Sequence, residues 1–334
     1  MPTTQTLSGD DLIVVTGGAG FIGSHIVGYL AKAGLRVVVC DLLRSGDKWR
    51  NLAPAGLDDL IRPDMLSDWL DRHGGKVSAI VHMGAISSTT EPDVDRFVAN
   101  KIRLTLDLWE WCAASGTRFI YASSAATYGD GRAGFRDDES PEALAALRPL
   151  NAYGWSKHVV DRRVAEDAIA GRPTPPQWAG LKFFNVYGPN EAHKGDMQSV
   201  AGKIYPVIQA GDPVTLFKSH DPNYPDGGQL RDFVYVKDCV ATVGWLLQNP
   251  KVSGLFNVGT GAARSFLDLV NAVGAAVGRS PKIRFVDTPA QLRDKYQYFT
   301  QADISKLRSA GFDQPFHGLE DGIRDFVDCL RDAE

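Results

Sequence analysis

Tyr153 and Lys157 lie four residues apart in the stretch AYGWSK, at the predicted start of a helix. This spacing puts both side chains on one helix face, about one turn apart. A phenol has a reference pKa of about 10 and is a poor base at neutral pH, but a nearby ammonium favours its phenolate form. Ser124, in the stretch YASSAATYG, ends a predicted strand and offers a hydroxyl to a reacting oxygen. Although a YxxxK pair alone also fits an ordinary amphipathic helix, the three residues together predict a proton-transfer centre.

A glycine-rich turn lies near the start of the chain. In TGGAGFIGSH, Gly17, Gly20 and Gly23 follow the predicted strand LIVVT and open a helix. Glycines there permit a tight strand-to-helix turn and let the backbone approach a pyrophosphate at the helix N-terminus. The triplet alone also fits a plain tight turn, but Asp41 closes the next strand roughly 20 residues on, which predicts a dinucleotide site. Lys157 would then hold the nicotinamide ribose and lower the pKa of the Tyr153 phenol.

The residues after the second strand leave the choice of nucleotide open. Asp41 can accept hydrogen bonds from an adenosine ribose, which favours NAD. Arg44, Lys48 and Arg50 in LLRSGDKWR form a cationic cluster that suits a 2′-phosphate, which favours NADP. A solvated loop would carry the same charges. The sequence therefore predicts NAD or NADP as the cofactor, tightly bound, one per subunit, without choosing between the two.

The secondary-structure pattern indicates how these residues are positioned. Short β-rich runs alternate with longer helical patterns from Leu12 to about Phe184, the signature of βαβ units. We expect an α/β fold, a Rossmann-type doubly wound parallel sheet with a smaller mixed α/β substrate lobe. Residues 1–184 would form the dinucleotide-binding domain and residues 185–334 mainly the lobe, with some later segments returning to the first domain. The expected strands are LIVVT, RVVVCD, AIVHM, RFIYAS and GLKFFNV, and the expected helices include residues 22–33, 93–115, 153–169, 200–210, 238–248, 266–277 and 319–330.

The composition restricts the class of partner. The chain has 334 residues, 44% of them hydrophobic, and a net charge of −4, which gives no basic field for nucleic acid or an anionic membrane. No apolar run approaches the ~18 residues of a membrane span, and the polar N-terminus has no signal-peptide core. The four cysteines show no CxxC spacing and the histidines no i+4 ligand partner, so no metal site is expected. We expect a cytoplasmic protein with a small-molecule partner.

The chain resembles the short-chain dehydrogenase/reductase superfamily, and within it the extended branch of nucleotide-sugar epimerases and dehydratases. FNVYGP, RDFVYVKD and FNVGTG are similar to substrate-lobe motifs of that branch, so the resemblance covers nearly the whole chain. Dehydratases of the branch usually carry Asp-Glu after the Ser/Thr position, whereas Ala125 and Ala126 follow Ser124 here. The resemblance therefore implies an epimerase, which removes a hydride from a carbinol and returns it to the opposite face.

Lys194, in the loop after the expected strand GLKFFNV, is a candidate for a second acid/base. Returning hydride to the other face presents the carbonyl oxygen in a second position, and Tyr153 can reach an oxygen only within about 2.6–3.2 Å. An enzyme that swings a short exocyclic arm would need another group there. MGAISSTTE, NVYGPNEAHKGDM and KYQYFTQAD resemble the ADP-heptose 6-epimerase family, in which a tyrosine and a lysine act as the two acid/bases. Tyr153 and Lys194 match them; a solvated loop lysine is the alternative.

The same resemblance implies binding residues, cofactor and partners. It implies an ADP-heptose substrate, a role in forming lipopolysaccharide core precursors, and a homo-oligomer, often a pentamer. Leu42, Asp196 and Lys203 differ from the residues usual in that family. Besides the three glycines and Lys157, the implied dinucleotide contacts are Phe21, Ile22, Asp41, Leu42, Lys48, Met83, Gly84, Ala85, Ser87, Asn100 and Val186. The implied sugar-nucleotide contacts are Ser87, Ser124, Asn185, Asp196, Lys203, Phe217, Ser219, Arg231 and Tyr296.

Two other functions are compatible with parts of the pattern. In a UDP-hexose 4-epimerase the whole sugar ring turns over, so one tyrosine serves both poses and Lys194 is incidental. A redox-sensing module that only binds NAD(P) would keep the glycine turn, but such a protein is expected to lose the Tyr/Lys pair. Tyr153 and Lys157 are both present, which favours an enzyme.

Overall fold

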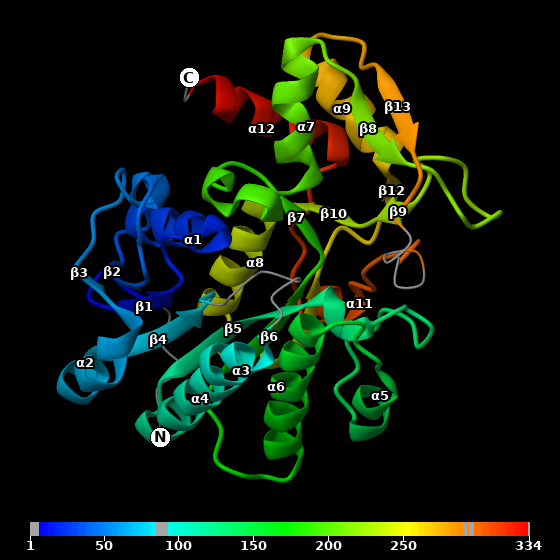
Figure 1. The fold of residues 1–334 in the computed structure, drawn as a ribbon. Helices are drawn as coiled ribbons and strands as arrows, with labels where there is room; N and C mark the ends of the chain where they lie inside the picture. Colours follow the sequence, from blue (N-terminus) through cyan, green and yellow to red (C-terminus); the bar gives the residue numbers. More distant parts are fainter. Residues whose placement is uncertain (1–6, 85–92, 290–292, 294–296, 333–334) are drawn as a thin grey trace.

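The computed structural model describes residues 7–84, 93–289, 293 and 297–332 of the chain. Three of the residues implied as contacts, Ala85, Ser87 and Tyr296, lie outside these ranges. Figure 1 shows a sheet-based body with helices on both sides and, above it, a smaller group of helices and short strands.

The body is built on one parallel sheet with the strand order β11-β6-β5-β4-β1-β2-β3. Strands β1, β4 and β5 have almost wholly buried apolar side chains, as expected where helices cover both faces. The order reverses between β1 and β4, and ligands of such sheets bind at that point, beyond the carboxyl ends of the strands. The predicted doubly wound α/β fold is therefore confirmed. The strands are β1 (Leu12–Thr16), β2 (Arg36–Cys40), β3 (Asp59–Ile61), β4 (Val77–His82), β5 (Arg118–Ser124), β6 (Trp178–Phe183) and β11 (Gly254–Val258).

Helices cover the two faces of this sheet. Helices α1 (Phe21–Lys32) and α8 (Val236–Gln248) pack together on one face, while α4 (Leu104–Ser115) and α6 (Ala152–Ile169) pack together on the other (Figure 1). The side chain of Asn151 accepts a hydrogen bond from the Gly154 N–H and caps the start of α6. This cap fixes the first turn of α6. The shorter helices of the body are α2 (Leu66–His73), α3 (Val94–Phe97), α5 (Pro141–Ala146) and α11 (Ser305–Ser309).

The helix expected over residues 93–115 differs from the prediction. It consists of α3, a π-helical segment η4 (Val98–Arg103), and α4. The apolar residues keep a helix-like spacing throughout, so the sequence period does not reveal the wider turn. Single π-helical turns inside α-helices are frequent at functional sites.

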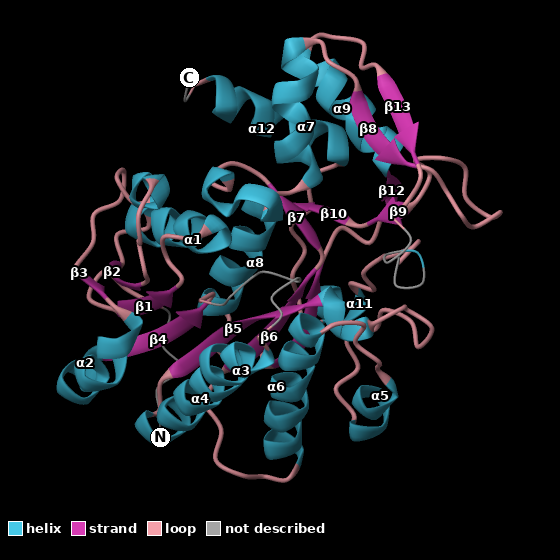
Figure 2. Cartoon of the chain, viewed as in Figure 1, coloured by secondary structure: helices cyan, strands magenta, loops and turns pink. Residues whose placement is uncertain are grey.

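The smaller lobe has its own buried cluster, in which α7 (Val200–Ala210), α9 (Phe266–Val277) and α12 (Leu319–Arg331) pack together. Figure 2 shows the strand pair β8 (Val214–Phe217) and β13 (Ile283–Val286) beside these helices. Two further pairs, β7 (Asn185–Tyr187) with β10 (Phe233–Tyr235) and β9 (Leu230–Arg231) with β12 (Arg264–Ser265), lie between lobe and sheet (Figure 2). No helix in the described part of the chain is long and apolar enough to cross a membrane.

Candidate active site

The glycine turn between β1 and α1 has no room for side chains. Gly17 has φ +65°, and a Cβ there would lie 2.6 Å from the Cα of Gly84. A Cβ on Gly23 would lie 2.1 Å from the carbonyl oxygen of Gly17. Gly20 is the N-cap of α1 and supplies no side-chain cap, so the first N–H groups of the helix stay available to a ligand. The turn therefore fits the pyrophosphate of a dinucleotide, held at the positive end of a helix.

A Gly23→Ala substitution is expected to remove the bound dinucleotide, because the added methyl would push the Gly17 carbonyl out of the turn. Nicotinamide absorbance of the purified protein measures the occupancy. Gly28→Ala is the matched control, since it adds a methyl to the same helix where nothing lies within 4 Å. Equal occupancy in both variants would contradict a dinucleotide at this turn.

Asp41 follows β2 and faces the glycine turn. Its Oδ2 accepts a hydrogen bond of 2.8 Å from the Ala19 N–H, and its Oδ1 accepts from the Leu42 N–H at 2.7 Å. Lys48 Nζ lies 2.6 Å from the same Oδ1. Asn51, in the same segment, donates to the Ala19 carbonyl at 3.0 Å. Asp41, predicted to bind the adenosine ribose, and Lys48, predicted to receive a 2′-phosphate, thus lie together beside the turn.

Tyr153, Lys157 and Ser124 are brought together by α6 and the end of β5. A side-chain hydrogen bond joins Tyr153 to Ser124 and lowers the phenol pKa, although burial raises that pKa by more. Lys157 Nζ donates to the Ala122 carbonyl oxygen at 2.5 Å. Burial lowers the pKa of Lys157 to about 8, against the attraction of Asp161. The spacing predicted from AYGWSK therefore puts a phenol, a hydroxyl and an amine at the carboxyl edge of the sheet.

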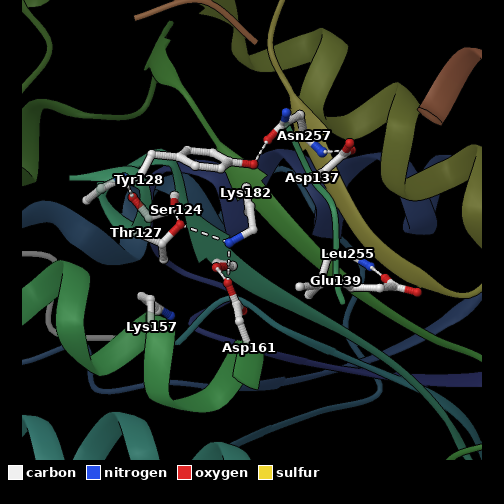
Figure 3. A network of polar contacts seen from close by, with 12 residues as sticks. Ser124, Thr127, Tyr128, Asp137, Glu139, Lys157, Asp161, Lys182, Leu255 and Asn257 are labelled. Carbon is white, nitrogen blue, oxygen red and sulfur yellow. Dashed lines mark hydrogen bonds and ion pairs between the residues drawn. The ribbon is translucent and has the colours of Figure 1, made fainter. Parts of the chain in front are cut away.

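A buried ion pair of Lys182 and Asp161 lies next to Ser124 and Lys157 (Figure 3). Lys182 Nζ on β6 lies 2.6 Å from Asp161 Oδ2 on α6, and both side chains are fully buried. Tyr121 and Ser123, on β5, donate hydrogen bonds of 2.9 and 2.7 Å to the same carboxylate. Asp161 lies one turn after Lys157, so the pair connects the helix that carries the amine to two strands of the sheet.

The segment that carries Lys194 is the short helix η6 (Ala192–Met197), anchored by Glu191. The buried Glu191 carboxylate accepts hydrogen bonds from the Ser199 N–H at 2.6 Å and the Ser199 hydroxyl at 2.5 Å. Lys194 Nζ lies 5.0 Å from the centre of the Phe21 ring, at the start of α1. The pKa of Lys194 is below its usual value, because burial and the nearby Lys203 lower it by more than Glu191 raises it. The Lys194 amine therefore lies over the ring of the first residue of α1.

Two hydrogen bonds join the chain before η6 to α1, and a third joins it to Asn51, which itself donates to the Ala19 carbonyl. Asn190 Nδ2 donates to the Ser24 hydroxyl at 3.1 Å, and His25 Nε2 lies 3.0 Å from the Pro189 carbonyl oxygen. Asn51 Nδ2 also reaches the Asn190 carbonyl at 3.3 Å. The chain before η6 is thus fixed to the element that opens the dinucleotide site.

The other predicted contacts are distributed over both parts of the molecule. Met83 and Gly84 follow β4, beside Thr16 of β1. Asn100 is exposed and donates to the Arg96 carbonyl at 2.9 Å. In the lobe, Phe217 ends β8 and Val186 lies in β7. Ile22 is partly buried in α1, and the remaining positions are exposed: Leu42, Asn185, Asp196 and Lys203.

Ser219 and Arg231 lie on the lobe side. The Ser219 hydroxyl donates to the Asp221 carbonyl at 2.8 Å, within its own loop. The largely buried Arg231 guanidinium lies 5.5 Å from the Phe266 ring, and its Nη1 donates to the Leu230 carbonyl at 2.8 Å. Ser219 is therefore held locally, while Arg231 is positioned by packing.

Several residues around the site were not singled out from the sequence. Glu191 has no motif spacing to Lys194 beyond a three-residue separation, and Asp161 and Lys182 pair only in three dimensions. Lys101 lies in a helix pattern where a lysine is ordinarily exposed, yet it is buried. A charge at a position that the helical period places on the apolar face is the one signal available for Lys101.

This fold and site define an NAD-dependent enzyme of sugar-nucleotide chemistry, and the comparisons agree. The chain belongs to the NAD dependent epimerase/dehydratase family, whose model matches residues 13–259. It is 50% identical to the ADP-L-glycero-D-manno-heptose-6-epimerase of Nitratidesulfovibrio vulgaris, over 95% of this chain and 97% of the relative. The protein of the same description from Fusobacterium nucleatum is 44% identical, over 95% and 97%. The family predicted from the motifs is confirmed.

Solved structures give the same result. The Helicobacter pylori ADP-L-glycero-D-manno-heptose-6-epimerase has a TM-score of 0.78 and 28% identity, covering 96% of each chain. The Thermus thermophilus UDP-glucose 4-epimerase, solved in complex with NAD, has a TM-score of 0.76 and 28% identity, covering 97% of this chain and 100% of its own. NAD and NADP are not distinguished by these comparisons.

Proposed function

We propose that the chain interconverts ADP-D-glycero-D-manno-heptose and ADP-L-glycero-D-manno-heptose by inverting C6″ through a transient ketone. The observation that carries the proposal is a pair of proton-transfer groups. Tyr153 is hydrogen-bonded to Ser124 and lies one helical turn before Lys157, and the Lys194 amine lies over the Phe21 ring at the start of α1. The names of the relatives described above support it. The product would serve as a lipopolysaccharide core precursor.

The bound NAD or NADP supplies the hydride acceptor and donor for C6″. Tyr153, as phenolate, takes the proton of the C6″ hydroxyl while the Ser124 hydroxyl holds the same oxygen. Lys157 favours the phenolate as a cation next to it. The Lys157 amine is itself held by the Ala122 carbonyl, so the positions of phenol and amine are coupled through α6.

Lys194 serves the second orientation of the arm. Rotation about the bond to C6″ displaces the oxygen, and an amine there gives or takes the proton that Tyr153 no longer reaches. Burial lowers the Lys194 pKa and so increases the fraction of neutral amine near neutral pH, while Glu191 favours the ammonium form.

Arg231 is proposed to bind the diphosphate. A guanidinium presents two parallel N–H donors and holds phosphate oxygens bidentately. Its packing on Phe266 fixes the plane of that fork. Asn185, Phe217, Ser219, Asp196 and Lys203 are proposed to contact the remainder of the sugar nucleotide, and Phe21, Ile22, Met83, Gly84, Asn100 and Val186 the dinucleotide.

The proposed reaction is tested by proton NMR of ADP-D-glycero-D-manno-heptose incubated with the purified holoenzyme. The C6″ signals of the L-glycero epimer should appear and approach a constant ratio without added nicotinamide nucleotide, because the hydride returns to the same carbon. UDP-glucose and UDP-galactose are the control substrates. Conversion of these alone would contradict the heptose assignment and support a UDP-hexose 4-epimerase.

For assembly and location we propose a cytoplasmic homo-oligomer, as the family resemblance implies. Sedimentation equilibrium of the holoenzyme measures the subunit number. A single 36.3 kDa species at all concentrations would contradict the proposed oligomer.

A further inference from the structure

Lys101 is a buried lysine whose amine has no hydrogen-bond partner among the described residues. Only 1% of its surface is exposed. The two other buried lysines of the body differ, because Lys157 donates to the Ala122 carbonyl and Lys182 pairs with Asp161. An amine removed from water without a hydrogen bond is costly, so its retention calls for a reason in function.

The Lys101 amine lies between two aromatic rings. Its Nζ is 3.9 Å from the centre of the Phe97 ring and 4.0 Å from the centre of the Tyr153 ring. Ring faces carry negative electrostatic potential and attract a cation. One of the two rings is that of the proposed acid/base, so the amine contacts the catalytic phenol through its ring face.

The π-helical segment η4 directs Lys101 inward. Its neighbours Asn100 and Arg103 are exposed, whereas Lys101 and Ile102 are buried. The Thr105 hydroxyl donates to the Lys101 carbonyl oxygen and holds the segment to α4. This segment therefore carries a lysine that is buried against α6.

No counter-ion lies beside Lys101 among the residues that the structure describes. From α6, Tyr153 and Lys157 face it; Asp161, the next acid on that helix, is occupied by Lys182. The charged residues of the other packed elements are exposed: Asp95 and Arg96 on α3, Arg103 on η4, and Asp107 and Glu110 on α4. Burial, and then repulsion from Lys157, lower the pKa of Lys101 to about 6. The two ring faces oppose this lowering of the Lys101 pKa, because both favour the ammonium form of the amine.

We propose that Lys101 is a positioning residue for Tyr153, whose ammonium, held over the phenol ring, stabilises the phenolate that takes the substrate proton. The inference rests on the proposed function of Tyr153. Loss of the phenol proton spreads negative charge into the ring, which favours the ammonium form of Lys101. The two groups then titrate as a coupled pair. The contact is with the ring face, so the effect is electrostatic and needs no proton transfer between them.

The test compares Lys101→Met with Lys101→Arg in the holoenzyme. Ultraviolet phenolate absorbance is titrated with pH, and the same titration of Tyr153→Phe is subtracted to isolate Tyr153. Without the ammonium, the phenolate is less stable, so the midpoint in Lys101→Met should rise by roughly half to one pH unit, the size expected of one cation–π contact. Lys101→Arg keeps a cation and should restore at least half of the shift.

Epimerisation gives a second readout. The acidic limb of the kcat–pH profile should move to higher pH in Lys101→Met by the same amount, with the wild-type rate recovered above the new midpoint. A purely structural role would lower kcat at every pH without moving the limb. Methionine fills the same space without a polar atom, so the variant should unfold at a temperature no lower than the wild type; if it does not fold, Lys101→Gln replaces it.

The outcomes separate the two proposals. An unchanged Tyr153 midpoint in Lys101→Met, or a rate loss independent of pH, would overturn the role of Lys101. If the wild type does not convert ADP-heptose, the proposed function fails, but the absorbance titration needs no substrate and still decides whether Lys101 acts on Tyr153.

Discussion

Replacing Lys194 with methionine is expected to reduce epimerisation of ADP-heptose by ~10²–10⁴-fold, the usual contribution of a general acid/base. Methionine keeps the length of the side chain and removes the titratable amine. The substitution removes the cation–π contact with Phe21, but the hydrogen bonds that hold the preceding chain to α1 do not depend on the Lys194 charge, so the dinucleotide should stay bound. NMR rates and nicotinamide absorbance of the same sample measure both effects.

The two epimers should respond differently, which sharpens this test. If Lys194 serves only one orientation of the arm, the variant still oxidises one epimer through Tyr153, and reduced nicotinamide accumulates in a single turnover. Tyr153→Phe should show the opposite preference. Lys251→Met, at an exposed lysine, is the control and should behave as wild type. Near-normal rates in Lys194→Met would refute the two-group mechanism.

Removing Lys182 is expected to have the largest effect on stability. Lys182→Met leaves the Asp161 carboxylate buried without its cation, and breaking such a pair typically costs about 3–5 kcal/mol. Tyr121 and Ser123 still donate to the carboxylate, but neither carries a charge, and burial raises the Tyr121 pKa well above its usual range. Denaturant unfolding of the holoenzyme measures the change in unfolding free energy.

The matched control is an exposed pair of the same length. Lys237 Nζ and Asp325 Oδ2 also lie 2.6 Å apart, with side chains 47% and 43% exposed, so Lys237→Met should cost no more than about 1 kcal/mol. In a Lys182→Met/Asp161→Asn double variant the amide oxygen accepts one hydroxyl hydrogen bond and the amide nitrogen donates to the other hydroxyl oxygen, without a net charge. That variant should be more stable than Lys182→Met. Equal losses for Lys182→Met and Lys237→Met would contradict the account of the pair.

Most of the fold follows from local patterns that the sequence displays directly. The strand of residues 12–16 and the helices of residues 200–210 and 266–277 have the predicted bounds, because an unbroken apolar run or a helical period ends at turn residues. The π-helical segment within residues 93–115 was not predicted, since one wider turn barely disturbs the spacing of apolar residues.

The candidate site was predictable where one element carries both partners. Tyr153 and Lys157 share a helix, so their spacing gives their proximity. Lys101 and Lys182 make their contacts with residues of another element, α6: Lys101 with Tyr153 and Lys182 with Asp161. No local sequence period encodes such contacts. Burial lowers the pKa of Lys194, and the opposing effect of Glu191, three residues before it, also could not be derived from the spacing alone.

The hydrogen bonds from Asn190 and His25 that tie the chain before η6 to α1 have one more consequence. Whatever steadies the first turn of α1 also steadies the amine of Lys194, so nucleotide occupancy and readiness for the second proton transfer would be gained in a single event. A subunit without its nucleotide would then lack both the hydride acceptor and a fixed position for the Lys194 amine, so a heptose that binds first could not react.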